Sequence, residues 1–208
     1  MRALVLLTLL AFAAMPARAE ASRPDGRWFL ITAGYALGAQ LEADAKTQVT
    51  AHGGIHPGSV HHPFPSHDLS SQVLAAMSSG ADMIALANAG DDTRNAIKTA
   101  AKLGLPNAKQ APAALFLTAT DIHSLGLAAA QGTTTPEGCC RDRDDGTRNF
   151  ARRFMAVHGG MPSVIQAGPC SATLHYLKTV VASGSREPNV AIAKMRELRP
   201  DLYPRITK

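Results

Sequence analysis

Hydrophobic and polar positions follow two alternating periods over the first two thirds of the chain. Short apolar runs predict β-strands at residues 27–32, 55–62, 83–87 and 113–117. Between them, apolar residues recur at helical spacing and predict helices over residues 35–52, 69–79 and 91–103, the first marked by Leu37, Leu41, Ala45 and Val49. Asp68 or Ser66 is expected to cap the second helix. Alternation of this kind favours a parallel sheet covered by helices on both faces.

The pattern changes after Thr118. A short helix is expected at residues 122–130, a weak strand at 132–136 and a charged turn at 141–146. Helices are then predicted over 147–158, 163–183 and 190–198, with Pro169 delaying the start of the middle one. The fold class predicted is α/β, a three-layer parallel-sheet lobe over residues 20–145 followed by a helical extension over 146–208.

The first 19 residues have the pattern of a secretory signal. Arg2 precedes an apolar run from Leu4 to Met15, and Ala17-Arg18-Ala19 supplies the small residues of a cleavage site. A membrane anchor is the alternative, but a span needs about 20 apolar residues and this run is shorter. We expect cleavage after Ala19 and a periplasmic protein.

Charge and cysteine content exclude some function classes. The formal net charge is +5, and the basic residues are scattered among acids, which argues against a nucleic-acid partner. The chain has 3 cysteines, of which Cys139 and Cys140 are adjacent, and either of these could pair with Cys170. The absence of a C-x-x-C spacing argues against a redox motif or a zinc ribbon.

The stretch "ALANAGDDTRNAIK" at residues 85–98 marks one of three expected strand-end corners, which lie at residues 33–37, 87–92 and 118–123. Ligands of parallel sheets bind outside such carboxyl ends. Asp91 and Asp92 place negative charge where a dinucleotide site would bind phosphate, which disfavours NAD, FAD and nucleoside triphosphates. A small polar zwitterion suits the corner better.

Four stretches, "RWFLITAGYALGAQLEAD", "GADMIALANAGDDTRNAIKTAAKLGL", "TDIHSLGLAAAQG" and "DDGTRNFARRFMAVHGGMPSVIQAG", together resemble the type I periplasmic binding proteins of branched-chain amino-acid ABC transporters. The resemblance covers residues 27–198. It implies a two-lobed receptor that closes on an amino acid or a related small amide and delivers it to a membrane permease. It implies no cofactor and no enzymatic activity.

The same resemblance implies ligand-binding residues at the three corners. They are Tyr35, the group Asn88, Ala89 and Gly90, and the pair Thr118 and Asp121, with Asp121 expected to meet a ligand ammonium group. Simpler roles compete with two of these. Tyr35 would serve equally as a first-turn residue that packs on the sheet, and Asp121 as the N-cap of a short helix.

This sequence departs from the family pattern in its extent. Arg27 matches the opening strand of the second lobe, so the usual first lobe and the last C-terminal portion are expected to be missing. In the family, the helices that match residues 147–198 pack on the first lobe, so here they must repack, bind another chain or stay exposed. One lobe supplies one wall of a cleft, and we expect weak ligand binding or none from a truncated member.

Three other functions compete with a receptor. A metal site is suggested by five histidines, but their spacing matches no ligand motif: His52, His56, His61, His62 and His67. An enzyme is disfavoured because no G-x-S-x-G motif occurs and the pair Ser171 and His175 is a common surface spacing on a helix. An interaction module or a remnant, self-associating through the face that would meet the first lobe, stays open.

Overall fold

The computed structural model describes residues 25–105, 109–137 and 142–198. The predicted signal at residues 1–19 and the adjacent cysteines Cys139 and Cys140 lie outside this range. The chain forms two compact units, which are treated separately below. Unit 1 runs to Leu117 and includes Asp121–Pro136, and unit 2 contains Thr118–Thr120 and the residues from Glu137 onward.

Unit 1 is built from alternating strands and helices. In chain order they are β1 (Arg27–Ala33), α1 (Ala36–Ala51), β2 (Ile55–His62), α2 (Ser70–Ser78), β3 (Met83–Ala87), α3 (Gly90–Lys102) and β4 (Ala111–Ala114). Two short helices follow, α4 (Ala119–Leu125) and α5 (Leu127–Ala130). The strands form a 4-stranded parallel sheet in the order β2-β1-β3-β4. The predicted α/β class with a parallel sheet is therefore confirmed.

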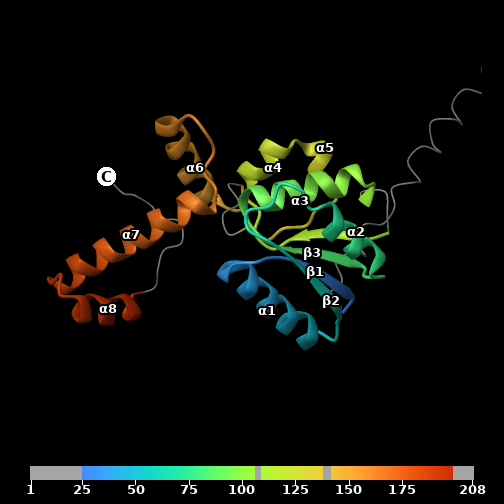
Figure 1. Cartoon of the computed structure of the whole chain (residues 1–208). Helices are drawn as coiled ribbons and strands as arrows, with labels where there is room; N and C mark the ends of the chain where they lie inside the picture. The colour runs from blue at the N-terminus through green and yellow to red at the C-terminus, as the bar shows by residue number, and fades with distance from the viewer. Residues whose placement is uncertain (1–24, 106–108, 138–141, 199–208) are drawn as a thin grey trace, which may run out of the picture. The chain divides into compact units, whose positions relative to one another are not determined.

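The strand order explains why helices cover both faces of the sheet. The connection from β1 to β2 runs in the opposite direction along the sheet from the connections that lead to β3 and β4. Crossovers of one hand then place α1 on one face and α2 and α3 on the other (Figure 1). The direction changes between β1 and β3, which makes this the switch point of the sheet.

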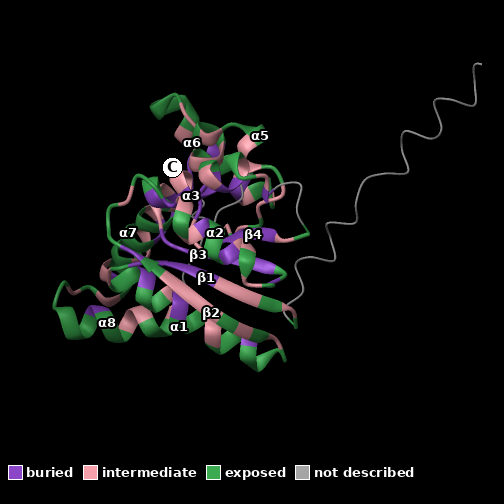
Figure 2. Cartoon of the chain, turned by 45° about the vertical axis from the view of Figure 1, so that its right-hand side comes forward, coloured by how far each residue is buried: buried purple, intermediate pink, exposed green. Residues whose placement is uncertain are grey.

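The larger hydrophobic core lies between the sheet and the helices α2 and α3. Twelve buried residues form it: Ile31, Leu69, Val73, Ala76, Ile84, Leu86, Ala96, Ile97, Ala100, Leu105, Ala114 and Leu117. Every residue of β3 and β4 is buried, as Figure 2 shows in purple. Strands covered on both faces lack a polar side, which is why the sequence of β3 is a continuous apolar run.

Helix α1 packs closely on the other face of the sheet, near the carboxyl ends of its strands. A Cβ atom at Gly38 would lie 2.2 Å from the Ala33 carbonyl oxygen and 3.0 Å from that of Ala87. Only glycine fits this approach. Farther along, Leu41 and Ala45 pack on Leu30 and Trp28, while Leu37 is exposed, so the predicted apolar stripe holds except at its first position.

Several predicted boundaries are corrected by the structure. Strand β4 occupies Ala111–Ala114 instead of residues 113–117, because its small residues carry little β-signal in the sequence. The strand expected at residues 132–136 is reduced to one parallel bridge between Ala113 and Thr134. The single helix expected at 122–130 is interrupted by Gly126, with a φ of +81°, and so becomes α4 and α5.

Unit 2 contains three further helices, α6 (Asp145–His158), α7 (Val164–Ser183) and α8 (Pro188–Glu197). Capping boxes begin α6 at Asp144 and α7 at Ser163. Helix α7 runs through Pro169, contrary to the predicted delay, although Pro169 offers no N–H to the carbonyl of Ile165. Within the described ranges, none of the helices combines the length and apolar character that crossing a membrane requires.

Apolar side chains stay exposed along unit 2. Val157 at the end of α6 is 92% exposed and Val181 in α7 is 83% exposed. Ile165 and Leu177 are about half exposed. These side chains are therefore exposed within unit 2, and the binding of another chain there stays a prediction.

Candidate functional site at the strand ends

The carboxyl ends of β1 and β3 bring two of the predicted corners together. Thr32 in β1 pairs with Ala87 in β3, so the chain leaves both strands at the same level of the sheet. The first corner leads to Tyr35 and the second to Asn88, Ala89 and Gly90. These residues therefore share the edge of the sheet at its switch point, where ligands of open α/β sheets bind.

Tyr35 is the N-cap residue of α1 and stacks on an aromatic ring from the next loop. Its ring centroid lies 4.5 Å from that of Phe64, and the two planes are inclined by 26°. Burial, and secondly the negative charge of Asp92, raises the pKa of the Tyr35 phenol. The phenol is thus neutral at physiological pH and available as a hydrogen-bond donor.

Asn88 has a fully buried side chain with a structural role. Its Oδ1 accepts a hydrogen bond from Thr93 Oγ1 at 2.8 Å, and its Nδ2 lies 3.4 Å from Nε2 of the buried His62. On the other side of the ring, His62 Nδ1 lies 2.8 Å from the Pro63 carbonyl oxygen. One assignment fits all three contacts: Nδ1 carries the proton and donates to Pro63, and Nε2 accepts from Asn88.

Asp92, in the first turn of α3, ties the same loop to the corner. Its Oδ1 accepts a hydrogen bond from the Ser66 backbone N–H at 3.0 Å, and its Oδ2 lies 3.7 Å from His62 Nδ1. The side chain of Asn95 reaches the Ser66 carbonyl oxygen at 3.2 Å. The loop after β2 is therefore held by α3 as well as by its own strand.

The start of α3 supplies backbone groups at the rim. Ala89 is its N-cap residue and makes no side-chain cap, and Gly90 has a φ of +61°, a conformation that favours glycine. A Cβ atom at Gly90 would meet nothing within 4 Å, so the rim is open at this point. A first turn without a side-chain cap leaves N–H groups available to a polar ligand.

The third corner contributes Asp121, which is paired with Arg94. The Arg94 guanidinium donates to the carboxylates of both Asp91 and Asp121. Burial lowers the pKa of Arg94, but these two carboxylates outweigh it and raise that pKa overall. A ligand ammonium group at Asp121 would have to share the carboxylate with this guanidinium.

Thr118 belongs to unit 2, where its hydroxyl lies 2.8 Å from that of Thr120. It is buried. Its predicted role in ligand binding stays a prediction.

Sequence reasoning missed two members of this cluster, Phe64 and His62. His62 is the last residue of the edge strand β2, and Phe64 follows it in the stretch His62-Pro63-Phe64-Pro65. Two prolines that flank an aromatic residue after a strand were the available signal, because they indicate a restrained loop that presents the ring.

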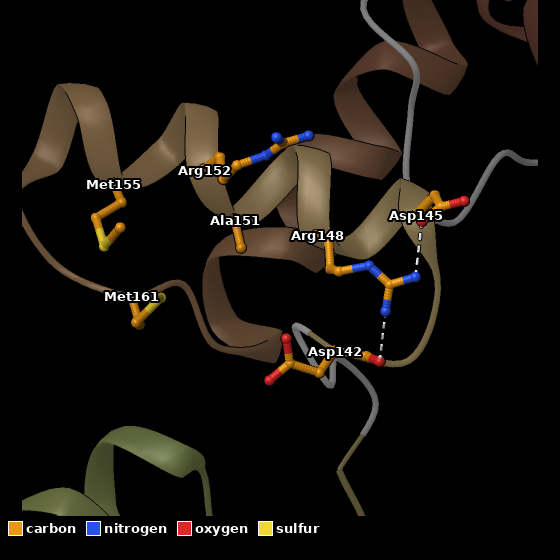
Figure 3. Close-up of a pocket in the computed structure, with 7 residues that line it drawn as sticks. All are labelled: Asp142, Asp145, Arg148, Ala151, Arg152, Met155 and Met161. Carbon is orange, nitrogen blue, oxygen red and sulfur yellow. Dashed lines mark hydrogen bonds and ion pairs between the residues drawn. The ribbon is translucent and has the colours of Figure 1, made fainter.

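Among the described residues, cavities also lie away from these corners. One, of about 380 Å³, is in unit 1 on the α1 side of the sheet and is lined mainly by apolar groups, including Trp28, Leu41 and Leu115. The other, of about 450 Å³, is in unit 2, where Arg148 donates to Asp145 and to the Asp142 carbonyl oxygen (Figure 3). None of the predicted site residues lines either cavity.

Three of the five histidines weighed as metal ligands have other partners. His52 Nδ1 lies 2.8 Å from the Gln48 carbonyl oxygen, His61 Nε2 lies 2.9 Å from a Glu42 carboxylate oxygen, and His62 is occupied as described. In the part of the chain that the structure describes, no group of three or more His, Cys, Asp or Glu side chains is arranged to hold a metal ion.

The fold and the sequence have clear relatives. A family model described as periplasmic binding protein matches residues 10–205. A solved periplasmic binding protein from Burkholderia mallei is 38% identical, with a TM-score of 0.81 over 89% of this chain and 50% of its own. A branched-chain amino-acid ABC transporter periplasmic ligand-binding protein from Burkholderia xenovorans is 36% identical, with a TM-score of 0.77 and the same two coverages.

More distant structures share the fold alone. One is a solute-binding protein of an ABC transporter from R. palustris in complex with 4-hydroxybenzoate, at 21% identity and a TM-score of 0.69, which this chain matches over 86% of its own length and 50% of the other. The curated proteins gave no match. This chain spans about half the length of the solved structures that it matches. It belongs to the periplasmic binding protein family, and its fold is that of the type I binding proteins of branched-chain amino-acid ABC transporters.

Proposed function

We propose that the chain is the periplasmic solute-binding component of an ABC importer for an amino acid or a related small amide. The observation that carries the proposal is the shared edge of β1 and β3, where Tyr35 and the start of α3 lie at the switch point of the sheet. Membership of the binding-protein family supports it. Delivery would be to a membrane permease, as the family implies.

The mechanism proposed is capture by hydrogen bonds without covalent chemistry. The neutral phenol of Tyr35 and the N–H groups at the start of α3 would bind the polar groups of the ligand. The carboxylates of Asp91 and Asp121 would attract its ammonium group, in competition with Arg94. Asn88 and Ala89 act in this scheme through their backbone or by shaping the corner, since the Asn88 side chain is buried.

The test is a calorimetric titration of the protein with a panel of amino acids and amides. Saturable binding of one class is expected. The variant Asp121→Asn should lower the affinity for amines, while Asp145→Asn, an exposed acid in unit 2, should leave it unchanged. No binding by any amino acid or amide would refute the proposal.

A second candidate, an interaction module, is favoured by the exposed apolar side chains of unit 2. The exposure of Val157 and Val181 to water is unfavourable if several such apolar side chains form one contiguous surface. Light scattering after size-exclusion chromatography distinguishes this function, because a defined dimer that dissociates in Val181→Lys supports it. A monomer at all concentrations refutes self-association.

A further inference from the structure

Phe64 is exposed on the strand-end edge, yet it is held in a fixed place. Its side chain is 54% exposed, while one face of the ring stacks on Tyr35 at 4.5 Å between centroids. Tyr35 was expected at the ligand site, and Phe64 extends the same aromatic surface toward β2. An apolar ring this exposed gains little from burial, so its position needs another explanation.

The loop around Phe64 is fixed on both sides by buried polar groups. Before it, His62 contacts the Pro63 carbonyl oxygen at 2.8 Å and is itself next to Asn88. After it, the Ser66 N–H donates to Asp92 and the Ser66 carbonyl oxygen accepts from Asn95. These contacts order the loop before any ligand arrives, which removes part of the entropy that binding would otherwise cost.

The charge next to this surface restricts what it binds. Asp91 has a 79% exposed side chain at the start of α3, and the negative charge of the buried Asp92 adds to the effect of burial in raising the pKa of Tyr35. The one cation among these groups, Arg94, is shared between Asp91 and Asp121. A carboxylate placed against the Tyr35 and Phe64 rings would meet this negative field, whereas an ammonium group would be attracted.

We propose that Phe64 determines specificity at this site, by stacking with Tyr35 to receive the apolar or aromatic side chain of an amine-bearing ligand. The inference rests on the proposed function and deepens it. It separates this site from one for aromatic acids, such as the 4-hydroxybenzoate bound by the R. palustris protein. An aromatic contact of this kind changes affinity by roughly 3- to 10-fold.

The test is calorimetric titration with L-phenylalanine, L-leucine, L-serine and benzoate, for the wild-type chain and for Phe64→Ala. We expect the variant to lose roughly 3- to 10-fold in affinity for phenylalanine and leucine and less than about twofold for serine. Benzoate should bind neither form. Leu127→Ala is the matched control, since Leu127 is an 80% exposed apolar residue in α5, and it should change nothing.

The outcomes separate this inference from the function on which it rests. Binding of phenylalanine with equal affinity by wild type and Phe64→Ala overturns the role of Phe64 and leaves the receptor function intact. Benzoate binding more tightly than phenylalanine overturns the ligand class. Failure of the wild type to bind any of the amino acids refutes the function, and the inference with it. Far-UV circular dichroism and thermal unfolding of both variants confirm that they are folded.

Discussion

The buried carboxylate of Glu42 accepts a hydrogen bond from the Ser59 hydroxyl at 2.7 Å, which joins helix α1 to the edge strand β2. Lys46 lies 2.5 Å from the same carboxylate oxygen, and His61 contacts the other oxygen at 2.9 Å. Burial alone would disfavour the charged form, but the bonds from Lys46 and Ser59 outweigh it and lower the pKa of Glu42 to about 2.

This pairing predicts acid sensitivity. The pKa of Glu42 is near 4.5 in the unfolded chain and about 2 in the folded one, so its contribution is complete above the higher value and is lost as pH falls toward the lower. Between pH 7 and pH 3 the wild type should lose about 2 kcal/mol more unfolding free energy than Glu42→Gln. Urea unfolding followed by Trp28 fluorescence measures this difference, and parallel pH profiles would contradict it.

Replacement of Asn88 should destabilise unit 1. Asn88→Ala leaves the Thr93 hydroxyl and the His62 ring without their partner in a buried place, at a cost of about 2–3 kcal/mol. Urea unfolding reported by Trp28 is again the measurement. Asn149→Ala, at an exposed position in α6, is the control and should shift the midpoint very little. Equal effects of the two changes would show that the contacts of Asn88 contribute nothing.

Gly38 should tolerate no side chain. A methyl group there would meet the Ala33 carbonyl oxygen at 2.2 Å, so Gly38→Ala must move α1 off the sheet, at a cost of about 2 kcal/mol or more. Gly168→Ala is the opposite case, because its Cβ atom would meet nothing within 4 Å inside α7, and it should stabilise that helix by about 0.5–1 kcal/mol. Thermal unfolding followed by circular dichroism compares the two. Stabilisation by both would contradict the close packing of α1.

The start of α6 depends on its capping box. Asp144 accepts from the Thr147 N–H at 2.8 Å, so Asp144→Ala should cost about 1 kcal/mol of helix stability. Asp145→Ala removes an exposed ion pair with Arg148 and should cost less than about 0.5 kcal/mol. Amide exchange in the first turn of α6 measures both. Faster exchange in the Asp145 variant than in the Asp144 variant would contradict the capping role of Asp144.

Long periodic segments were predictable from the sequence, and short irregular ones were not. The apolar run of β3 and the helical spacing of α1 follow directly from burial. The sequence pattern therefore predicts both the type and the position of these two elements. The predicted position of β4 was wrong because Ala111-Pro112-Ala113-Ala114 has low β-propensity. This segment is a strand only because it pairs with β3. Tertiary pairing of this kind leaves no local signal.

The candidate site was predictable in outline only. Strand alternation placed Tyr35 and Asn88 at one edge, because parallel strands end together. The contact of Phe64 with Tyr35 joins residues on two separate loops, and no spacing in the chain encodes it. The pairing of Asp121 with Arg94 likewise depends on how α3 lies beside the third corner.

The bridge at Thr134 has a consequence for how copies of the chain behave at high concentration. Thr134 donates its N–H to the Pro112 carbonyl oxygen at 3.0 Å and accepts from the Ala114 N–H at 2.8 Å, which occupies the outer border of β4. These backbone groups of β4 are therefore not available to pair with an added strand. At the other edge of the sheet, Pro57 in β2 has no N–H to donate to such a strand. Both margins therefore resist the addition of further strands, which protects the unit from amyloid-like growth.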